Sequence, residues 1–275
     1  MINKVIHLKE YFPMLKYDVK LTTYCVGSWV KQTETRKRKA VLLLPAGGYR
    51  FVSRRENEPV ALRLVGEGIN VFSLDYTVAP FEYPYPLVEA YAALAYIRQH
   101  SDELLTDPNH IGVMGFSAGG HLAASISCYK DYNYYSEYLN VDSKLLDIQG
   151  CLLGYPVISM EVGDPETILN ITQGREELRD YFSIDKHITS SFPKTFIFVT
   201  AEDKCAIPEN SLRLASSLIK NNVFCEMHIY PKGFHGLSLS NDIIFDPIED
   251  KETLDECLYN EEWFIQAIHF IKEYL

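Results

Sequence analysis

The sequence predicts an α/β fold in which a mostly parallel central sheet is flanked by helices. Short, mostly apolar segments recur along the 275 residues, and stretches with helical spacing lie between them. Apolar runs of this kind are typical of strands buried on both faces of a parallel sheet, and their alternation with helices is typical of α/β folds. No linker, repeat or low-complexity tract divides the chain, so we expect one domain over residues 1–275.

The strands follow from these runs in chain order. The segment 17–30 alternates more strongly than the later ones and predicts antiparallel edge strands. Several of the later runs are rich in β-branched or aromatic residues, which favours buried strands. These parallel strands are expected at 39–45, 69–76, 111–116, 150–158, 194–200 and 223–230.

The helices are predicted from apolar spacing and from their end signals. Residues 58–68 have proline in the first turn and glycines at the end, the usual asymmetry of a helix start and stop. Leu87, Tyr91 and Leu94 lie on one face of a helix expected at 86–100. Further helices are expected at 119–127, 208–222 and 261–275.

Two segments interrupt this alternation, at about 128–148 and 159–192. Both follow the C-terminal side of a predicted strand, where open α/β sheets bind ligands, so we expect lid or pocket insertions there. The first is crowded with tyrosines, which either stack on a sugar or pack within the protein; the amphipathic ring favours packing. These tyrosines are Tyr129, Tyr132, Tyr134, Tyr135 and Tyr138.

Composition excludes several classes of protein. A formal net charge of −11 argues against nucleic-acid binding, because the phosphates would be repelled. The six cysteines form no C-x-x-C pair and no metal-ligand spacing, so we expect reduced thiols, a cytoplasmic protein and no metal site. Charges interrupt every apolar stretch of residues 1–13, which predicts neither a signal peptide nor a membrane anchor.

The stretch "VMGFSAGGHLAA" (113–124) places Ser117 between Gly115 and Gly119, where a predicted strand becomes a helix. One interpretation is a tight turn that needs small residues. The other is a nucleophile held on a strained strand-to-helix turn, with the free N–H groups of the helix beside it. The strand before the motif and the helix after it favour the nucleophile.

A serine nucleophile needs a base, and the base needs a carboxylate to fix its tautomer. His121 lies on the helix that the turn directs away from the serine, so we interpret it as structural. His235 follows the last strand between two glycines and is the expected base. Asp203, just beyond the end of strand 194–200, is the expected acid, with Glu202 as the alternative.

The "PAGGY" stretch (45–49) ends the first long apolar strand. The N–H groups of Gly47 and Gly48 could join that of Ala118 as oxyanion donors; the alternative is a plain glycine turn. The expected triad partners favour the oxyanion hole. Tyr49, the next residue, is expected to shape a small acyl pocket.

These stretches resemble the α/β-hydrolase esterases related to acetyl esterases and acetylxylan esterases, the sugar-ester hydrolases among esterase/lipases. The matching segments span most of the chain in the family's order: 43–64, 76–80, 83–98, 111–125, 153–159, 208–218 and 231–239. The resemblance implies an α/β-hydrolase fold with Ser117 as nucleophile, Asp203 as acid and His235 as base. It also implies the oxyanion donors named above.

The sequence therefore predicts a serine carboxylesterase that removes short acyl groups, acetyl above all, from an alcohol such as a sugar or xylo-oligosaccharide. No metal or organic cofactor is expected, and the partner is a small-molecule ester. The rate should fall as the pH drops through the histidine's pKa, near 6.5 if unperturbed. The alternatives are a formamidase or peptidase on the same fold, and a catalytically silent ligand-binding module. A homodimer is expected if the apolar face of the C-terminal helix is exposed.

Overall fold

The computed structural model describes residues 1–28, 35–80, 83–129, 132–245 and 251–275. In these ranges one eight-stranded sheet has the order β1-β2-β4-β3-β5-β6-β7-β8. The strands are β1 (Ile2–His7), β2 (Lys20–Cys25), β3 (Arg38–Leu44), β4 (Asn70–Asp75), β5 (Thr106–Phe116), β6 (Gly150–Gly154), β7 (Lys194–Thr200) and β8 (Cys225–Tyr230). From β4 to β8 every neighbouring pair is parallel, so the predicted mostly parallel sheet is confirmed.

The segment 17–30 is predicted to form antiparallel edge strands, and in its described part the antiparallel pairing is confirmed, whereas the edge position is wrong. β2 is antiparallel to both neighbours and lies inside the sheet, between β1 and β4. The edge is β1, whose residues Asn3 to Val5 are exposed while Ile6 is buried. An edge strand with one face in solvent accommodates charged side chains, which is why the interrupted N-terminal pattern still forms a strand. Residues 29–30 of the prediction lie outside the described ranges.

The predicted strand at 150–158 is too long. β6 ends at Gly154 because Tyr155 has a φ of 35°, in the left-handed region that breaks a strand. The residues after it leave the sheet and approach the turn at Ser117, because Val157 N–H donates to Ser117 O at 3.1 Å. This early exit brings the chain to the candidate site.

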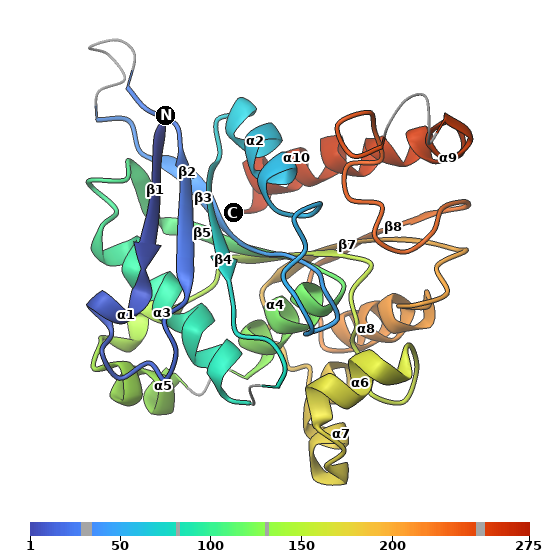
Figure 1. Ribbon diagram of the computed structural model, residues 1–275, viewed down its shortest axis with the longest axis horizontal. Coiled ribbons are helices and arrows are strands. Elements are labelled where there is room, and N and C mark those ends of the chain that lie inside the picture. The colour runs from blue at the N-terminus through green and yellow to red at the C-terminus, as the bar shows by residue number, and fades with distance from the viewer. Residues whose placement is uncertain (29–34, 81–82, 130–131, 246–250) are drawn as a thin grey trace.

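Helices cover both faces of the sheet. α2 and α10 lie on one face, and α1, α3, α4 and α8 on the other (Figure 1). The helices are α1 (Leu8–Tyr11), α2 (Glu58–Gly66), α3 (Tyr85–Gln99), α4 (Ala118–Cys128), α5 (Tyr132–Leu139), α6 (Pro165–Thr172), α7 (Glu176–Phe182), α8 (Glu209–Lys220), α9 (Lys251–Cys257) and α10 (Glu262–Tyr274). Three short 3₁₀ turns are η2 (Ser143–Leu146), η3 (Ile184–Lys186) and η4 (Leu258–Glu261). The predicted helices after β3, β4, β5, β7 and β8 are all present.

Alternation along each strand fills two separate cores. In β3, Leu42 and Leu44 point into the core under α3 and α4, while Val41 and Leu43 point into the core under α2 and α10. All four side chains are fully buried. Burial of both faces explains why β3 reads as a continuous apolar run.

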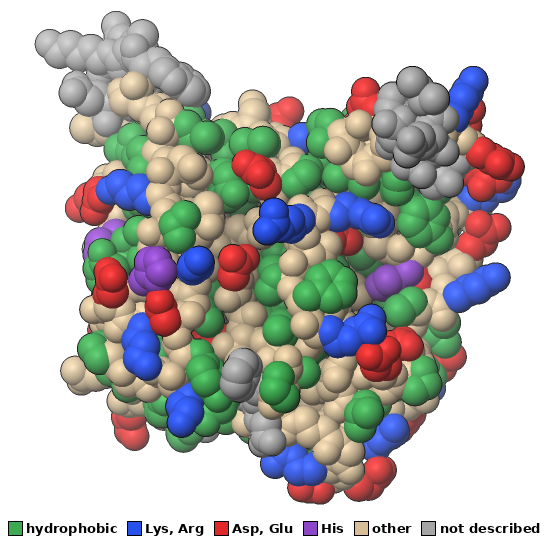
Figure 2. Space-filling model, in the orientation of Figure 1, with side chains coloured by type: hydrophobic (Ala, Val, Ile, Leu, Met, Phe, Trp, Pro, Cys, Tyr) green, Lys and Arg blue, Asp and Glu red, His purple; other side chains and the backbone are tan. Residues whose placement is uncertain are grey.

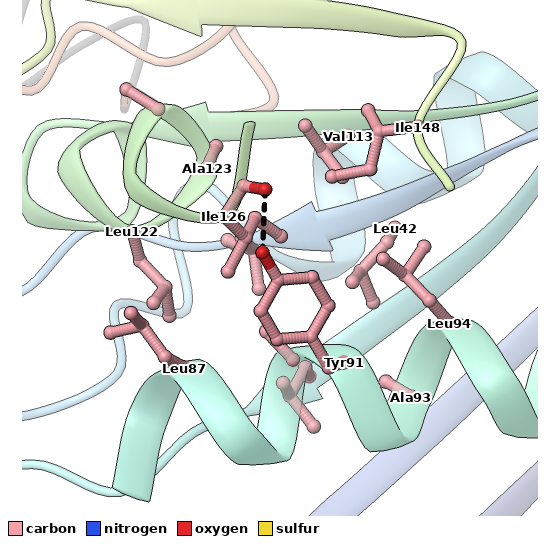
Figure 3. Packing of buried hydrophobic residues seen from close by; sticks show 14 of the residues in the cluster. Leu42, Leu87, Tyr91, Ala93, Leu94, Val113, Leu122, Ala123, Ile126 and Ile148 are labelled. Atoms are coloured by element: carbon pink, nitrogen blue, oxygen red, sulfur yellow. Dashed lines mark hydrogen bonds between the residues drawn. The ribbon is translucent and has the colours of Figure 1, made fainter. Parts of the chain in front are cut away.

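α3 is buried on almost its whole surface, whereas the sequence indicated a single apolar face. The sheet covers one side of it, and α1, α4, α5 and η2 pack around the rest. Figure 3 shows the contact with α4, where the Tyr91 hydroxyl donates to the carbonyl oxygen of Ile126 at 2.8 Å. This hydrogen bond satisfies the one polar atom that Tyr91 buries among Leu87, Leu94 and Leu122.

The two long segments occupy different places. The first forms α5 and η2, which pack on α3, and its tyrosines pack on other rings: Tyr129 stacks on Tyr181 at 4.4 Å, and Tyr135 lies against Tyr91. The second forms α6, α7 and η3 and reaches the turn after β3, where Asn170 Nδ2 donates to Gly48 O at 2.9 Å. Only the second therefore contacts the loop of the expected oxyanion donors through a hydrogen bond in the described residues.

The apolar face of α10 packs on the sheet, with Trp263, Phe264 and Phe270 buried, and Ile265 is exposed on the opposite side. The homodimer was expected only if the apolar face of this helix is exposed, and in the structure that face is covered by the sheet.

On the face shown in Figure 2, acidic and basic side chains are interspersed. Surface pairs such as Lys272–Glu67 are half exposed and contribute at most about 1 kcal/mol each, so the two cores hold the fold. Across the described ranges, no helix has the length and apolar character needed to span a membrane.

Candidate active site

Ser117 lies at the turn between β5 and α4 with φ 54° and ψ −119°, a conformation that L-residues rarely adopt. Hydrogen bonds hold the turn from both sides. Ser117 N–H donates to Gly154 O at 3.0 Å, and Ser117 O accepts from His121 N–H at 3.0 Å. Strained backbone persists only where its surroundings over-determine it, which is the case here.

Close packing explains the small residues of the turn. A Cβ on Gly119 would lie 2.1 Å from Leu44 O and 2.3 Å from Pro45 O, so α4 approaches the end of β3 closely at this point. No side chain fits at that distance. The G-x-S-x-G pattern therefore has a packing cause as well as the one expected of a nucleophile.

His235, in the loop after β8, lies between Ser117 and Asp203. Its Nε2 is 2.7 Å from Ser117 Oγ, and its Nδ1 is 2.7 Å from Asp203 Oδ2. An ionised carboxylate only accepts hydrogen bonds, so Nδ1 carries a proton. In the neutral ring, Nε2 is then free to accept the serine hydroxyl proton.

The structure brings Asp203, the expected acid, to the histidine. Asp203 is buried, and its other oxygen accepts from the backbone N–H groups of Cys205 and Ala206 at 2.9 and 3.0 Å. Glu202 is exposed, and its carboxylate accepts from Gly233 N–H at 3.2 Å. Glu202 therefore braces the histidine loop and does not contact the ring through a hydrogen bond in the described residues.

These contacts change the basicity of His235. Burial lowers the pKa of the imidazole, but the hydrogen bond and charge of Asp203, together with contact to Cys205, raise it to about 10. The sequence-based expectation of a value near 6.5 therefore needs correction. The physical reason is that Asp203 and Cys205 together stabilise the imidazolium more than desolvation destabilises it.

Ala118 directly follows Ser117, and Gly47 and Gly48 follow the end of β3, which α4 approaches closely. Gly47 and Gly48 have φ values of 136° and 61°, and a Cβ on Gly47 would lie 1.8 Å from Phe51 O, so the turn needs glycine there. Ala118 is the first residue of α4, where N–H groups have no helical partner. Among the turn, loop and side-chain hydrogen bonds of the described residues, none uses the N–H of these three residues.

Tyr49 follows these glycines and is almost fully buried. Its hydroxyl lies 3.2 Å from Nδ1 of His121, and Nε2 of His121 lies 3.1 Å from Phe182 O. A carbonyl only accepts, so Nε2 carries the proton and Nδ1 accepts from Tyr49. Burial lowers the pKa of His121 to about 4, while the bond to Phe182 opposes this, so the ring is neutral at pH 7. His121 thus holds Tyr49 and Phe182, as its structural interpretation predicts.

Two recesses flank the group. One is a small, mostly apolar cavity that includes both Tyr49 and His121 in its wall. Its lining residues are Tyr49, Ala79, Tyr83, Pro86, Leu87, His121, Asn170, Ile171, Gln173 and Phe182. The other is an open groove lined by the loops of Asp203 and His235, with the polar side chains of Asp164, Glu202 and Lys204 and the half-exposed ring of Phe234.

Some residues around the site carry no local signal in the sequence. Asn170 contacts Gly48 across 122 positions, and Glu56 and Tyr155 contact each other across 99. Only the folded chain brings such pairs together. In the part of the chain that the structure describes, no group of three or more His, Cys, Asp or Glu residues is placed to hold a metal ion.

Comparisons with known proteins agree with this architecture. A family model described as alpha/beta hydrolase fold matches residues 41–239. Endo-1,4-beta-xylanase B of Butyrivibrio fibrisolvens is 32% identical over 222 residues, covering 76% of this chain and 34% of that protein. An acetylxylan esterase of Xylanibacter ruminicola is 26% identical over 213 residues, covering 74% of this chain and 42% of that protein. The chain thus corresponds to less than half the length of these two relatives.

A solved structure is similar over its whole length. The crystal structure of an acetyl ester-xyloside bifunctional hydrolase from Caldicellulosiruptor lactoaceticus has a TM-score of 0.78 and 31% identity, with 97% of each chain covered. An alpha/beta hydrolase enzyme from a deep-sea metagenome library, MGS-M1, has a TM-score of 0.77 and 27% identity. It covers 100% of this chain and 98% of that one.

Proposed function

This chain belongs to the alpha/beta hydrolase fold family, and on that premise we propose that it is a serine carboxylesterase that hydrolyses short-chain acyl esters. We include in the proposal that the acyl group is acetyl and that the alcohol is a sugar or xylo-oligosaccharide. One observation supports this above all others. His235 bridges Ser117 Oγ and the Asp203 carboxylate with two contacts of 2.7 Å, the arrangement that activates a serine.

In the proposed reaction, Ser117 Oγ attacks the ester carbonyl carbon while its proton passes to Nε2 of His235. The carbonyl electrons move to oxygen, and the N–H groups of Gly47, Gly48 and Ala118 donate to that oxyanion. The carbonyl then re-forms, the bond to the alcohol breaks, and His235 gives its proton to the leaving oxygen. Asp203 stays ionised and holds Nδ1–H throughout.

Water completes the cycle. His235 takes a proton from water as its oxygen attacks the acyl-serine, and returns that proton to Ser117 as the acid leaves. Two half-reactions of this kind need neither a metal nor an organic cofactor. The products are a carboxylic acid and an alcohol.

The two recesses support an assignment of substrate parts. His235 must reach the leaving oxygen, so the alcohol lies in the groove next to His235, and the acyl group lies on the side of Tyr49. The cavity beside Tyr49 is apolar and small, which suits a short acyl chain. The groove offers carboxylates, a lysine and the ring of Phe234, which suit a polyhydroxylated alcohol.

The names of the relatives point to the same substrate. Two of them are an acetylxylan esterase and an acetyl ester-xyloside hydrolase. The six cysteines form no C-x-x-C pair in the sequence, which supports a further part of the proposal, a reducing and therefore cytoplasmic location.

The test is a set of initial rates on p-nitrophenyl acetate, butyrate and octanoate for the wild type, Ser117→Ala and Ser127→Ala. Ser127 is a buried serine near the other end of α4, so its variant is a matched control. We expect the highest rate on acetate, loss of activity in Ser117→Ala and retention in Ser127→Ala. Acetate release from acetylated xylo-oligosaccharides then tests the alcohol.

Covalent labelling separates the rival functions. A fluorophosphonate should label Ser117 in the wild type, as located by peptide mass spectrometry. A silent ligand-binding module does not label. A protein that labels but hydrolyses none of the esters would support the formamidase or peptidase alternative, with an aryl formamide and a peptide p-nitroanilide as the next substrates.

A further inference from the structure

A short segment after β3, residues 53–56, contacts both loops of the proposed active site. Toward the oxyanion loop, Ser53 N–H donates to Ala46 O at 2.8 Å. Toward the histidine loop, Arg55 Nη1 donates to Gly236 O at 3.0 Å, and the Ser238 hydroxyl donates to Arg55 O at 2.7 Å. The segment therefore joins two loops that are almost 190 positions apart in the sequence.

Glu56 is the buried centre of this segment. It is 2% exposed, and its Oε1 accepts from the Tyr155 hydroxyl at 3.1 Å while its other oxygen accepts from the Ser53 hydroxyl. The Tyr155 oxygen in turn accepts from Ser238 N–H at 3.0 Å. We call this chain of hydrogen bonds, from Ser53 through Glu56 and Tyr155 to Ser238, the relay. When Glu56 is ionised, each hydrogen bond of the relay has one donor and one acceptor, so no polar group in it is left unpaired.

Tyr155 connects the relay to the reacting residues. It directly follows Gly154, whose carbonyl accepts from Ser117 N–H, and the edge of its ring packs against the His235 ring at a centroid distance of 5.2 Å. Its φ of 35° is a strained conformation, and its side chain is fully buried. A displacement of the Tyr155 hydroxyl would therefore move the loop that holds His235.

The cost of the arrangement argues for a role beyond packing. A buried carboxylate destabilises a protein unless hydrogen bonds and neighbouring charge compensate; here the neighbouring charge is that of Arg55. Burial indeed raises the pKa of Glu56, while the bonds from Ser53 and Tyr155 oppose that rise. An apolar side chain of similar size would avoid this cost, so the stability of the fold alone does not explain the carboxylate.

We propose that Glu56 and Tyr155 are positioning residues, which fix the His235 loop through Ser238 so that the imidazole stays aligned between Ser117 and Asp203. This inference rests on the proposed function, because it assigns a task in that same site. Neither residue takes part in proton transfer. Each acts through the loop, and a misplacement of about 1 Å in such a group costs roughly 100-fold in rate.

The experiment compares Tyr155→Phe with Tyr91→Phe. Both changes remove one buried hydroxyl that has hydrogen-bond partners, but Tyr91 lies in the core between α3 and α4 (Figure 3). We expect Tyr155→Phe to lower kcat on p-nitrophenyl acetate roughly 10- to 100-fold, with KM changed less than about twofold. Tyr91→Phe should lower the melting temperature while kcat stays within about twofold of wild type.

A second pair of variants tests the carboxylate. Glu56→Gln can still accept from Tyr155 and donate to Ser53, so it should retain most of kcat, whereas Glu56→Ala should lose as much as Tyr155→Phe. Equal losses in the glutamine and alanine variants would contradict the relay, as would a kcat for Tyr155→Phe that matches Tyr91→Phe.

An NMR titration of the His235 ring gives a readout without activity, with His235→Asn to assign the signals. In Tyr155→Phe we expect the imidazole pKa to fall by at least about one unit, because the contact with Asp203 loosens; in Tyr91→Phe it should not change. An unchanged titration in Tyr155→Phe overturns the inference. If the wild type neither hydrolyses esters nor labels at Ser117, the proposed function fails, and the titration still decides on the relay.

Discussion

Nδ1 of His235 lies 2.7 Å from Oδ2 of Asp203, a carboxylate whose residue is only 3% exposed. Burial lowers the pKa of the imidazole, but this contact and the contact with Cys205 together outweigh burial and raise the pKa to about 10. A base must be neutral to accept the serine proton. We therefore expect kcat/KM to rise with pH through the alkaline range, in place of a plateau above pH 7.

Asp203→Asn tests this directly. Without the carboxylate, burial lowers the pKa of the ring and only the contact with Cys205 opposes it, so the acid limb of the profile should move to a lower pH than in the wild type, and kcat should fall on the order of 10⁴-fold. The measurement is kcat/KM from pH 5 to 10.5, corrected for spontaneous ester hydrolysis. Acid limbs at the same pH in both proteins would show that Asp203 does not set the basicity of His235.

Much of the fold could be predicted from the sequence because its signals are local. The apolar runs of β3 to β8 and the end signals of α2 each depend on about ten consecutive residues. The interior position of β2 and the burial of α3 depended instead on neighbouring elements that are distant in the sequence. β2 is interior only because β1 pairs with its other edge, and α3 is buried all round only because α1, α5 and η2 cover it.

The candidate site divides in the same way. The turn at Ser117 has its glycines within a few residues, so the sequence indicates it. The sequence favours Asp203 over Glu202 because Asp203 lies further past the strand end, but which of the two side chains contacts His235 depends on the folded loop. The contact of Glu56 with Tyr155 had no signal at all, since the partners lie 99 positions apart.

Tyr49→Ala should change the acyl preference of the enzyme. Tyr49 borders the small apolar cavity, so removal of its ring leaves room for longer acyl chains. We expect the ratio of the butyrate to the acetate rate to rise about tenfold, as is common for one or two methylenes in an apolar pocket. A ratio of two rates on one preparation does not depend on the folded fraction.

Tyr49→Phe is the matched control. It removes only the hydroxyl near His121 and keeps the volume of the ring. Its butyrate-to-acetate ratio should equal that of the wild type. The acyl-pocket assignment fails if Tyr49→Ala also leaves the ratio unchanged.

Gly119→Ala should destabilise the protein and abolish activity. Its Cβ would lie 2.1 Å from Leu44 O and 2.3 Å from Pro45 O, so α4 must separate from β3. Overpacking of this kind costs about 1–3 kcal/mol or more of unfolding free energy. Urea denaturation followed by circular dichroism measures the loss.

Gly66→Ala is the control for that change. Gly66 is the last residue of α2, it is exposed, and nothing lies within 4 Å of an added Cβ. Alanine there should leave stability unchanged or raise it by up to about 1 kcal/mol. Similar losses in both variants would mean that close packing at the turn is not what Gly119 provides.

Glu89 should make stability depend on pH. It is buried in α3, where its carboxylate accepts from Thr77 N–H at 2.8 Å and from the Thr77 hydroxyl. Burial raises the pKa of Glu89 to about 7, and the bonds from Thr77 offset only part of this effect. A group whose pKa is higher in the folded state stabilises the fold below its unfolded value of about 4.5, and this contribution is lost as the pH rises through 7.

Glu89→Gln keeps the shape of the side chain and removes its titration. Relative to this variant, we expect the wild type to lose on the order of 3 kcal/mol of unfolding free energy between pH 4.5 and pH 8. Urea denaturation at half-unit steps of pH measures the difference. Glu67→Gln, at an exposed pair with Lys272, should differ from the wild type by less than about 1 kcal/mol at any pH. A constant offset between Glu89→Gln and the wild type over this window would show that the buried carboxyl keeps the same protonation state when the chain unfolds.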